Sequence, residues 1–280
     1  MTLHKRIERR MNVVIDNQQL LEFVPSPVAD VDIWMAQTEL RSHKLAELAA
    51  MLSTDERAHE DIPAPRSGYE RFALTRGLLR TVLGEYLDVE PGAVELTYGL
   101  NGKPLLAETF ASSNIHFNLS HSGGIAVVAV ARGFRVGLDI ERLRFRADFS
   151  ELSRRVLTER ELEKLSTTLN ACQRKTFYRY WVRKEAYLKG TGTGLAFPPR
   201  DVDVSAATFY RSDQPVTIPI VNDRPVPWRI YDLQLPGLGG TLVGALAIEE
   251  TPLDRNNECS GDRIALQALE RGGTNEEVAV

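Results

Sequence analysis

The stretch Trp181–Gly194, WVRKEAYLKGTGTG, restricts the structure of this chain more than any other segment. Residues four apart in an α-helix lie on one face, so we expect Trp181, Glu185 and Lys189 to form a single stripe. The glycines at positions 190, 192 and 194 then form a loop that allows close backbone approach to a ligand. Together they suit a metal ion and a phosphate. The alternative is an ordinary exposed ion pair on a helix that ends in glycine.

A second segment, VGLDIE at residues 136–141, alternates in the way of a β-strand. Its apolar residues would face one side of the strand, and Gly137, Asp139 and Glu141 the other. Two carboxylates separated by one residue can converge on one hard cation, which prefers oxygen ligands. With Glu185 as a third carboxylate, the set would suit Mg²⁺. An amphipathic strand with its acids in water is the alternative.

A third segment, HFNLSHSGG at residues 116–124, precedes the apolar run IAVVAVA. This pattern predicts strand, turn, strand, with residues 120–124 at the connection. The hydroxyl of Ser120, the imidazole of His121 and unpaired turn amides would suit a phosphate. Serine and glycine are equally common in turns that bind nothing. Upstream, NGKP at residues 101–104 is a turn that carries one cation, Lys103.

Taken in order, NGKPLL, HFNLSHSGG, VGLDIE and WVRKEAYLKGTGTGL resemble the motifs of the 4′-phosphopantetheinyl transferases. The match is to the long type that activates surfactin synthetase, and it extends from Leu52 to about Val204. The resemblance implies an enzyme that moves the 4′-phosphopantetheine arm of coenzyme A to a serine of an apo carrier protein. The carrier would be of the acyl, peptidyl or aryl class, and adenosine 3′,5′-bisphosphate would be released.

The resemblance also implies roles for the acidic motifs. Asp139, Glu141 and Glu185 would coordinate Mg²⁺, which neutralises the pyrophosphate and stabilises charge on the leaving phosphate. Glu185 would also take the proton of the attacking serine hydroxyl, with Lys189 as the second catalytic residue. Trp181 and Lys184 would support these groups from behind. Glu161 matches an acid of the family whose role stays open.

For coenzyme A, the resemblance implies a cationic set. Lys103 would lie beside the adenine and the 3′-phosphate, and Arg71 matches a further cation for the 3′-phosphate. In the LSTDERAH segment, where relatives often carry cations, this chain has Arg57 and His59, and Arg57 facing solvent is the alternative. The residues predicted to bind the coenzyme are Arg71, Lys103, Ser120, His121 and Lys189.

The fold implied by the resemblance is α+β, with two similar α/β halves in a pseudo-twofold arrangement and the site between them. A faint repeat supports this, because a helical pattern is followed by a Gly-Gly strand twice, at 71–86 and again at 175–189. We also expect a hairpin over Leu233–Leu246 and a short helix over 261–273. The predicted parts are a mobile N-terminal extension at 1–20, an N-terminal half at 21–134, a C-terminal half at 135–250 and a polar tail at 251–280.

Composition agrees with this interpretation. The chain has 280 residues, 43% of them hydrophobic, so it can bury a sizeable core. Its net charge of −4 lacks the basic character of nucleic-acid-binding domains. Cys172 and Cys259 have no ligand spacing, and the longest apolar runs are too short to span a bilayer. We therefore expect a cytoplasmic monomer, because one chain holds both halves, with neither nucleic acid nor membrane as a partner.

Two other classes of protein stay open. A coenzyme A-binding protein that has lost transfer would lack the residues matched by Asp139, Glu185 or Lys189, and none is lost. A Mg²⁺-dependent hydrolase of coenzyme A would use water as nucleophile, and it would release the bisphosphate without a carrier.

Overall fold

The computed structural model describes residues 14–15, 18–19, 21–38, 42–57, 66–99, 101–143, 150–205, 216–218, 227–236 and 240–250. Within the segment predicted as an extension, strands β1 (Val14–Ile15) and β2 (Gln18–Gln19) pair with each other. The predicted helix at 261–273, as well as His59 and Cys259, lies outside the described residues. In the part of the chain described here, no helix is both long and apolar enough to cross a membrane.

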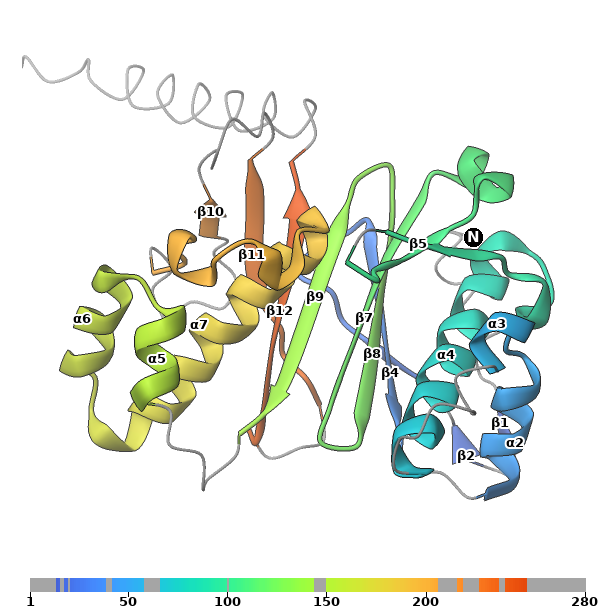
Figure 1. Cartoon of the computed structure of the whole chain (residues 1–280), viewed down its shortest axis with the longest axis horizontal. Helices are drawn as coiled ribbons and strands as arrows, with labels where there is room; N and C mark the ends of the chain where they lie inside the picture. The colour runs from blue at the N-terminus through green and yellow to red at the C-terminus, as the bar shows by residue number, and fades with distance from the viewer. Residues whose placement is uncertain are drawn as a thin grey trace, which may run out of the picture.

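The first four-stranded sheet is antiparallel, with the order β3-β4-β8-β7. Its strands are β3 (Glu22–Val24), β4 (Val31–Gln37), β7 (Ile115–Ser122) and β8 (Ile125–Arg132). The helix α4 (Arg66–Leu87) packs against it, with α2 (Ser42–Ala50) and α3 (Thr54–Arg57) alongside (Figure 1). The helix predicted at 71–86 is thus confirmed within α4, which is longer at both ends.

The second four-stranded sheet is also antiparallel, with the order β10-β11-β12-β9. Its strands are β9 (Val136–Arg142), β10 (Val216–Ile218), β11 (Trp228–Asp232) and β12 (Leu242–Glu249). The helices beside it are α5 (Ser150–Val156), α6 (Glu159–Thr167) and α7 (Asn170–Thr191). The predicted hairpin is confirmed, but its first strand ends at Asp232, before the predicted start. Residues 237–239 of its predicted turn are not described.

Shorter elements lie between the helices and strands within each layer. The hairpin of β5 (Leu96–Tyr98) and β6 (Pro104–Leu106) lies between α4 and β7 in sequence. The 3₁₀ turns are η2 (Pro91–Ala93), η3 (Glu108–Ser113), η4 (Gly194–Ala196) and η5 (Pro199–Asp201).

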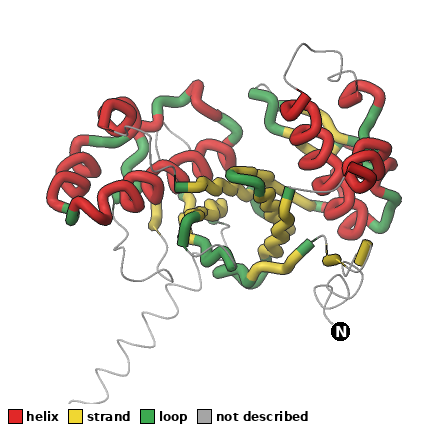
Figure 2. Tube along the Cα trace, turned by 90° about the horizontal axis from the view of Figure 1, so that it is seen from below, coloured by secondary structure: helices red, strands yellow, loops and turns green. Residues whose placement is uncertain are grey.

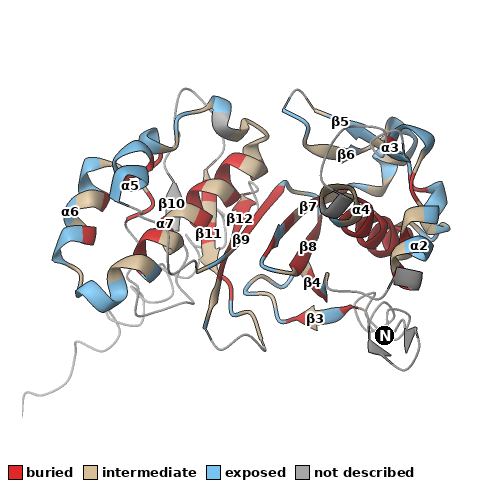
Figure 3. Cartoon of the chain, turned by 60° about the horizontal axis from the view of Figure 1, so that its bottom comes forward, coloured by how far each residue is buried: buried red, intermediate tan, exposed pale blue. Residues whose placement is uncertain are grey.

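The two sheets pack together in the middle of the molecule, with a group of helices on either side (Figure 2). One apolar cluster lies between the sheets and includes Ile33 and Val127 from the first sheet and Leu138 and Leu246 from the second. Each sheet also has one apolar cluster between it and its own helices. The buried faces of α4 and α7 point toward their sheets (Figure 3). Helices and antiparallel sheets confirm the α+β class. The pseudo-twofold relation and the division after residue 134 stay predictions.

Two glycines let strand β9 and helix α7 touch backbone to backbone. A Cβ atom on Gly137 would lie 2.0 Å from the carbonyl oxygen of Ala186 and 2.7 Å from the Cα of Gly190. A Cβ on Gly190 would in turn lie 2.5 Å from the Trp228 ring. The prediction that Gly190 belongs to a ligand-binding loop is therefore wrong. It lies inside α7, which ends at Thr191 and is capped by Gly192 in the left-handed conformation, with φ of 75°.

Candidate active site

The connection between β7 and β8 is tighter than predicted. Only Gly123 and Gly124 form the turn, with φ of 58° and 82°, because positive φ at both positions matches the twist of a two-residue hairpin. Ser120, His121 and Ser122 belong to β7 instead. Alternation along the strand therefore separates them: Ser120 and Ser122 are buried, whereas His121 is exposed.

Strand β9 places its carboxylates as the alternation predicted. Val136, Leu138 and Ile140 pack in the cluster between the sheets. Asp139 points away from that cluster but is only 4% exposed, so the alternative of an acid in water is excluded for it. Burial raises the pKa of Asp139, while Lys189 and a hydroxyl bond oppose the rise.

The serines of β7 bind the two carboxylates of β9. The Oγ of Ser120 donates to Oδ1 of Asp139 at 2.9 Å, and the Oγ of Ser122 donates to Oε2 of Glu141 at 2.7 Å. The predicted contact of Ser120 with a phosphate stays a prediction, since the proton of its hydroxyl has another partner here. Its one proton is directed to a carboxylate because residue 120 lies on the strand face toward β9.

Helix α7 adds the remaining two groups of the predicted centre. The Nζ of Lys189 donates to Oδ1 of Asp139 at 2.6 Å and to Oγ of Ser120 at 3.1 Å. Burial, followed by the negative charges of Asp139 and Glu141, raises the pKa of Glu185 to about 7, against the lowering effect of Lys189. A carboxylate with this pKa can exchange a proton near neutral pH, which is the property of a general base.

Two buried carboxylate oxygens of this centre have no hydrogen-bond partner among the described residues, namely Oδ2 of Asp139 and Oε1 of Glu185. Buried polar atoms are normally paired, so these two oxygens fit the binding of a cation. Oxygen-only donors are also what Mg²⁺ prefers. Within the described segments, however, no three acidic, histidine or cysteine side chains converge closely enough to hold an ion. The ammonium of Lys189 lies on Asp139 in this arrangement.

A cavity of about 490 Å³ opens beside this centre, between α4, the β5–β6 turn, β7 and the end of α7. Four of the five predicted coenzyme-binding residues line it, Ser120 being the exception, and none of its described lining residues is an acid. Aromatic and cationic surface together suits a nucleotide with several phosphates. The four are Arg71, Lys103, His121 and Lys189.

A smaller cavity of about 390 Å³ adjoins the first and shares Arg71 and His121 with it. Its wall also includes Glu141 and the turn at Gly123 and Gly124. Although His121 is exposed on the strand, the neighbouring protein atoms partly desolvate its ring, and this desolvation, together with the positive charges of Lys189 and Arg71, lowers the pKa of His121. The cationic residues of the larger cavity therefore lie close to Glu141, one of the predicted metal ligands, which lines the smaller cavity.

The turn between β5 and β6 holds the end of α7. Lys103 Nζ donates to the carbonyl oxygens of Lys189 at 2.7 Å and Gly190 at 3.2 Å. Asn101 Nδ2 donates to the carbonyls of Gly192 and Thr193, both at 2.9 Å. Burial, followed by the charge of Arg135, lowers the pKa of Lys103 to about 8. The predicted coenzyme residue Lys103 therefore also caps the helix that carries Glu185.

Arg76 was not predicted from the sequence, although it lines the larger cavity. Its guanidinium lies 5.4 Å from the ring centres of both Phe72 and Tyr98, and its buried Nη1 has no hydrogen-bond partner in the described part of the chain. Helical spacing places it four residues after Phe72 on α4, and this aromatic–cation pair was the available signal. Arg57, by contrast, does not line either cavity and donates its Nε to the carbonyl of Leu52 at 3.0 Å.

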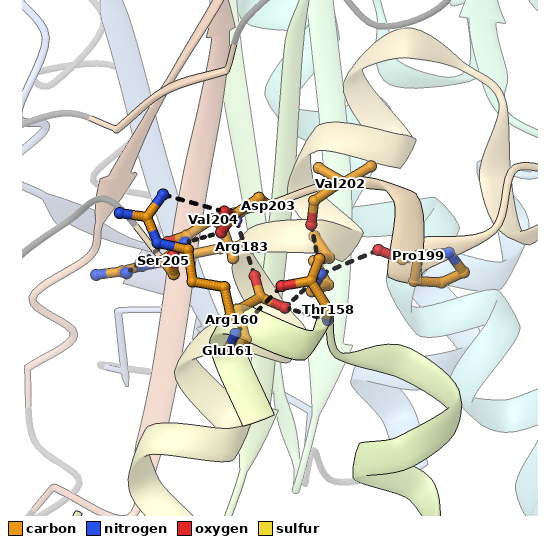
Figure 4. Close-up of polar contacts among 10 residues, drawn as sticks. Thr158, Arg160, Glu161, Arg183, Pro199, Val202, Asp203, Val204 and Ser205 are labelled. Carbon is orange, nitrogen blue, oxygen red and sulfur yellow. Dashed lines mark hydrogen bonds and ion pairs between the residues drawn. The ribbon is translucent and has the colours of Figure 1, made fainter. Parts of the chain in front are cut away.

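Glu161, whose role the sequence left open, forms an ion pair at 2.7 Å with Lys184, which was predicted to support the site, and both side chains are 0% exposed. Figure 4 shows Glu161 among its neighbours. Glu161 also accepts hydrogen bonds from the backbone of Thr158 and Val204, at 2.9 and 2.8 Å. Lys184 donates to the carbonyls of Pro199 and Val202. The pair ties α6, η5 and the segment after η5 to α7, at the residue that precedes Glu185 in sequence. Trp181 packs against the apolar cluster between the second sheet and its helices.

Comparison with known proteins identifies related sequences. Residues 135–237 match the family model described as the 4′-phosphopantetheinyl transferase superfamily, and residues 42–132 match one described as 4′-phosphopantetheinyl transferase, N-terminal. The 4′-phosphopantetheinyl transferase HetI of Nostoc sp. is 42% identical over 170 residues, which cover 60% of this chain and 70% of HetI.

Two further relatives match over smaller shares of their length. A putative 4′-phosphopantetheinyl transferase of Synechocystis sp. is 29% identical over 59% of this chain and 65% of its own. The human L-aminoadipate-semialdehyde dehydrogenase-phosphopantetheinyl transferase is 32% identical over 44% of this chain and 42% of its own. The matched stretch thus covers less than two thirds of each of these two relatives.

Proposed function

This chain belongs to the 4′-phosphopantetheinyl transferase family, and from that premise we propose that it transfers the 4′-phosphopantetheine arm of coenzyme A to a serine of an apo carrier protein. The observation that carries the proposal is one arrangement: a cationic cavity that adjoins two buried carboxylates with unpaired oxygens. A polyphosphate ligand complements the cavity, and a cation complements the carboxylates.

In the proposed reaction, the serine oxygen of the carrier attacks the phosphorus that bears the pantetheine arm. The bond from this phosphorus to the bridging oxygen breaks, and adenosine 3′,5′-bisphosphate leaves with the bond electrons. Glu185 accepts the serine proton, which its pKa of about 7 favours. Asp139, Glu141 and Glu185 would hold Mg²⁺, which when bound neutralises charge on the pyrophosphate.

The cavity residues would bind and orient the coenzyme. Lys189 supplies a point charge to the pyrophosphate, while Arg71 and His121 approach the nucleotide from α4 and β7. Lys103 would bind beside the adenine and 3′-phosphate while it keeps the end of α7 in place. Arg76, with its unpaired Nη1, adds a further cation to this set. Ser120 would act through Asp139 and Lys189.

We further propose that the chain is of the long, surfactin-synthetase-activating type and acts as a cytoplasmic monomer. Matches to both an N-terminal and a superfamily model along one chain support this, because both halves of the site come from one molecule. The net charge of −4 gives no reason to expect nucleic acid or membrane as a partner.

Intact-mass spectrometry of several apo carrier proteins tests the transfer. After incubation with this protein, Mg²⁺ and coenzyme A, the carrier should gain the mass of one phosphopantetheine group, and a carrier whose acceptor serine is replaced by alanine should not. Release of the bisphosphate from coenzyme A without any carrier would instead favour the hydrolase. Binding without either product would favour a coenzyme-binding protein.

The coenzyme site has its own test. Arg71→Ala should weaken coenzyme A binding by roughly ten- to a hundredfold, as expected for one lost charged hydrogen bond. Titration calorimetry with coenzyme A and with dephospho-coenzyme A measures the loss. A smaller loss with the dephospho form would assign Arg71 to the 3′-phosphate, whereas equal losses would remove it from that role. Arg57→Ala is the matched control, because Arg57 lines neither cavity.

A further inference from the structure

Strands β7 and β9 are edge strands of different sheets, and the side chains of β7 bind the backbone of β9. Three β7 residues, spaced by two, accept hydrogen bonds from N–H groups exactly twenty positions later in the sequence. The pairs are Asn118 with Leu138 at 2.9 Å, Ser120 with Ile140 at 3.2 Å and Ser122 with Arg142 at 3.0 Å. We name these three acceptor side chains the β7 ladder. It satisfies edge amides that would otherwise lack partners.

Two members of the β7 ladder also reach carboxylates. Ser120 donates to Asp139 and Ser122 donates to Glu141, while each accepts a backbone N–H from β9. A hydroxyl has one proton, so accepting the amide leaves that proton free for the carboxylate. Each serine therefore fixes a backbone position and the carboxylate beside it at the same time. Asn118 contacts no carboxylate in the hydrogen bonds of the described residues, where it accepts from the backbone of Leu138.

We propose that Ser120 and Ser122 are positioning residues that orient Asp139 and Glu141 as metal ligands. The inference rests on the proposed function, because it takes these carboxylates to bind Mg²⁺. Hydrogen-bond partners behind a metal ligand fix its direction, and their loss typically weakens metal binding. It assigns to the serines of the HFNLSHSGG segment a role other than the phosphate contact that the sequence predicted.

Burial supports this role over a direct phosphate contact. Ser120 and Ser122 are 4% and 8% exposed. Ser120 lines neither cavity, and Ser122 lines only the smaller one, beside Glu141. In addition, Ser120 accepts from Lys189 at 3.1 Å, so its hydroxyl contacts both members of the Lys189–Asp139 pair. Ser122 is the cleaner test position, because its hydroxyl contacts Glu141 and the backbone of Arg142 alone among the bonds described.

The experiment titrates Mg²⁺ alone into the purified full chain by calorimetry, without coenzyme A. Ser122→Ala should weaken Mg²⁺ binding by about ten- to a hundredfold, as is usual for a lost partner of a metal ligand. Ser122→Thr keeps the hydroxyl and should restore most of the affinity. Asn118→Ala is the matched control: it removes a β7 ladder bond of the same kind without touching a carboxylate, and it should leave Mg²⁺ affinity within about twofold of the original chain.

Thermal melting of each variant, with and without Mg²⁺, separates folding from positioning. Weaker Mg²⁺ binding in Ser122→Ala with a normal Asn118→Ala supports the proposal. Equal weakening in both variants, or unchanged binding in Ser122→Ala, overturns it, because the β7 ladder then only joins the strands. Absence of Mg²⁺ binding by the original chain would overturn the metal assignment of the proposed function, and with it this inference. The mass measurement on the carrier then tells whether transfer itself survives.

Discussion

Lys184 and Lys189 lie five residues apart on helix α7, and each pairs with a carboxylate from another element. Lys184 and Glu161 are both 0% exposed, and backbone groups satisfy the rest of their hydrogen bonding. Lys189 is 31% exposed, and its partner Asp139 keeps one buried oxygen unpaired. The two ion pairs are nearly equal in length, but only the Lys184–Glu161 pair is complete, in the sense that its buried polar atoms have partners. The complete pair holds the fold, and the incomplete one has capacity left for a ligand.

Removing the lysine of the complete pair should have the largest effect. Lys184→Met should lower the free energy of unfolding by about 3–5 kcal/mol, because Glu161 stays behind as an unpaired buried charge. Urea denaturation measures the loss. Lys189→Met is the matched control on the same helix, and it should lose less stability because its ion pair borders a cavity. Equal losses at the two positions would remove the distinction between the pairs.

At the incomplete site, the expected loss is in turnover. Glu185→Gln keeps the size of the side chain but removes its charge and basicity, so kcat should fall by about 10²-fold. Coenzyme A affinity should change much less, because the cavity cations remain. Single-turnover transfer to an apo carrier, measured beside coenzyme binding, checks both. A normal single-turnover rate would remove Glu185 from the catalytic step.

The raised pKa of Glu185 predicts a pH dependence in the metal-free protein. Its pKa rises from 4.5 to about 7 on folding, so the folded state binds more protons between these values. Stability should therefore fall as pH rises through this window, by on the order of 1–2 kcal/mol once solvent screening is allowed for. Denaturation of the original chain and Glu185→Gln at pH 4.5, 6 and 7.5 isolates the contribution. A parallel slope in both proteins would assign it to other groups.

The smallest effect should come from a third pair near the complete one. Arg160 and Asp203 approach at 3.7 Å with 64% and 39% of their side chains exposed, so water screens them (Figure 4). Arg160→Ala should change the free energy of unfolding by less than about 1 kcal/mol. If Arg160→Ala lowered the free energy of unfolding as much as Lys184→Met, burial would not explain the difference between the exposed and the buried pair.

Sequence predicted the parts of the site whose information is local. Alternation placed Asp139 opposite the apolar face of β9, and helical spacing placed Glu185 and Lys189 on one side of α7. It failed where a partner from another element decides the role. The direction of the Ser120 hydroxyl depends on β9 lying beside β7, and the pairing of Glu161 depends on the fold of residues 199–205. Neither contact leaves a periodic signal.

The contact of Gly137 with Gly190 has an evolutionary consequence. Gly137, the glycine of the Gly-x-Asp-x-Glu pattern, takes no part in the chemistry, yet any Cβ atom there would lie 2.0 Å from the Ala186 carbonyl oxygen. A drifting lineage could therefore keep every acid and lysine and still lose the reaction through one added methyl group. Gly190 cannot shift to make room for that methyl group, because the Trp228 ring packs closely against it. A survey of divergent family members that checks only the acidic and lysine residues of the motifs would count such lineages as active enzymes.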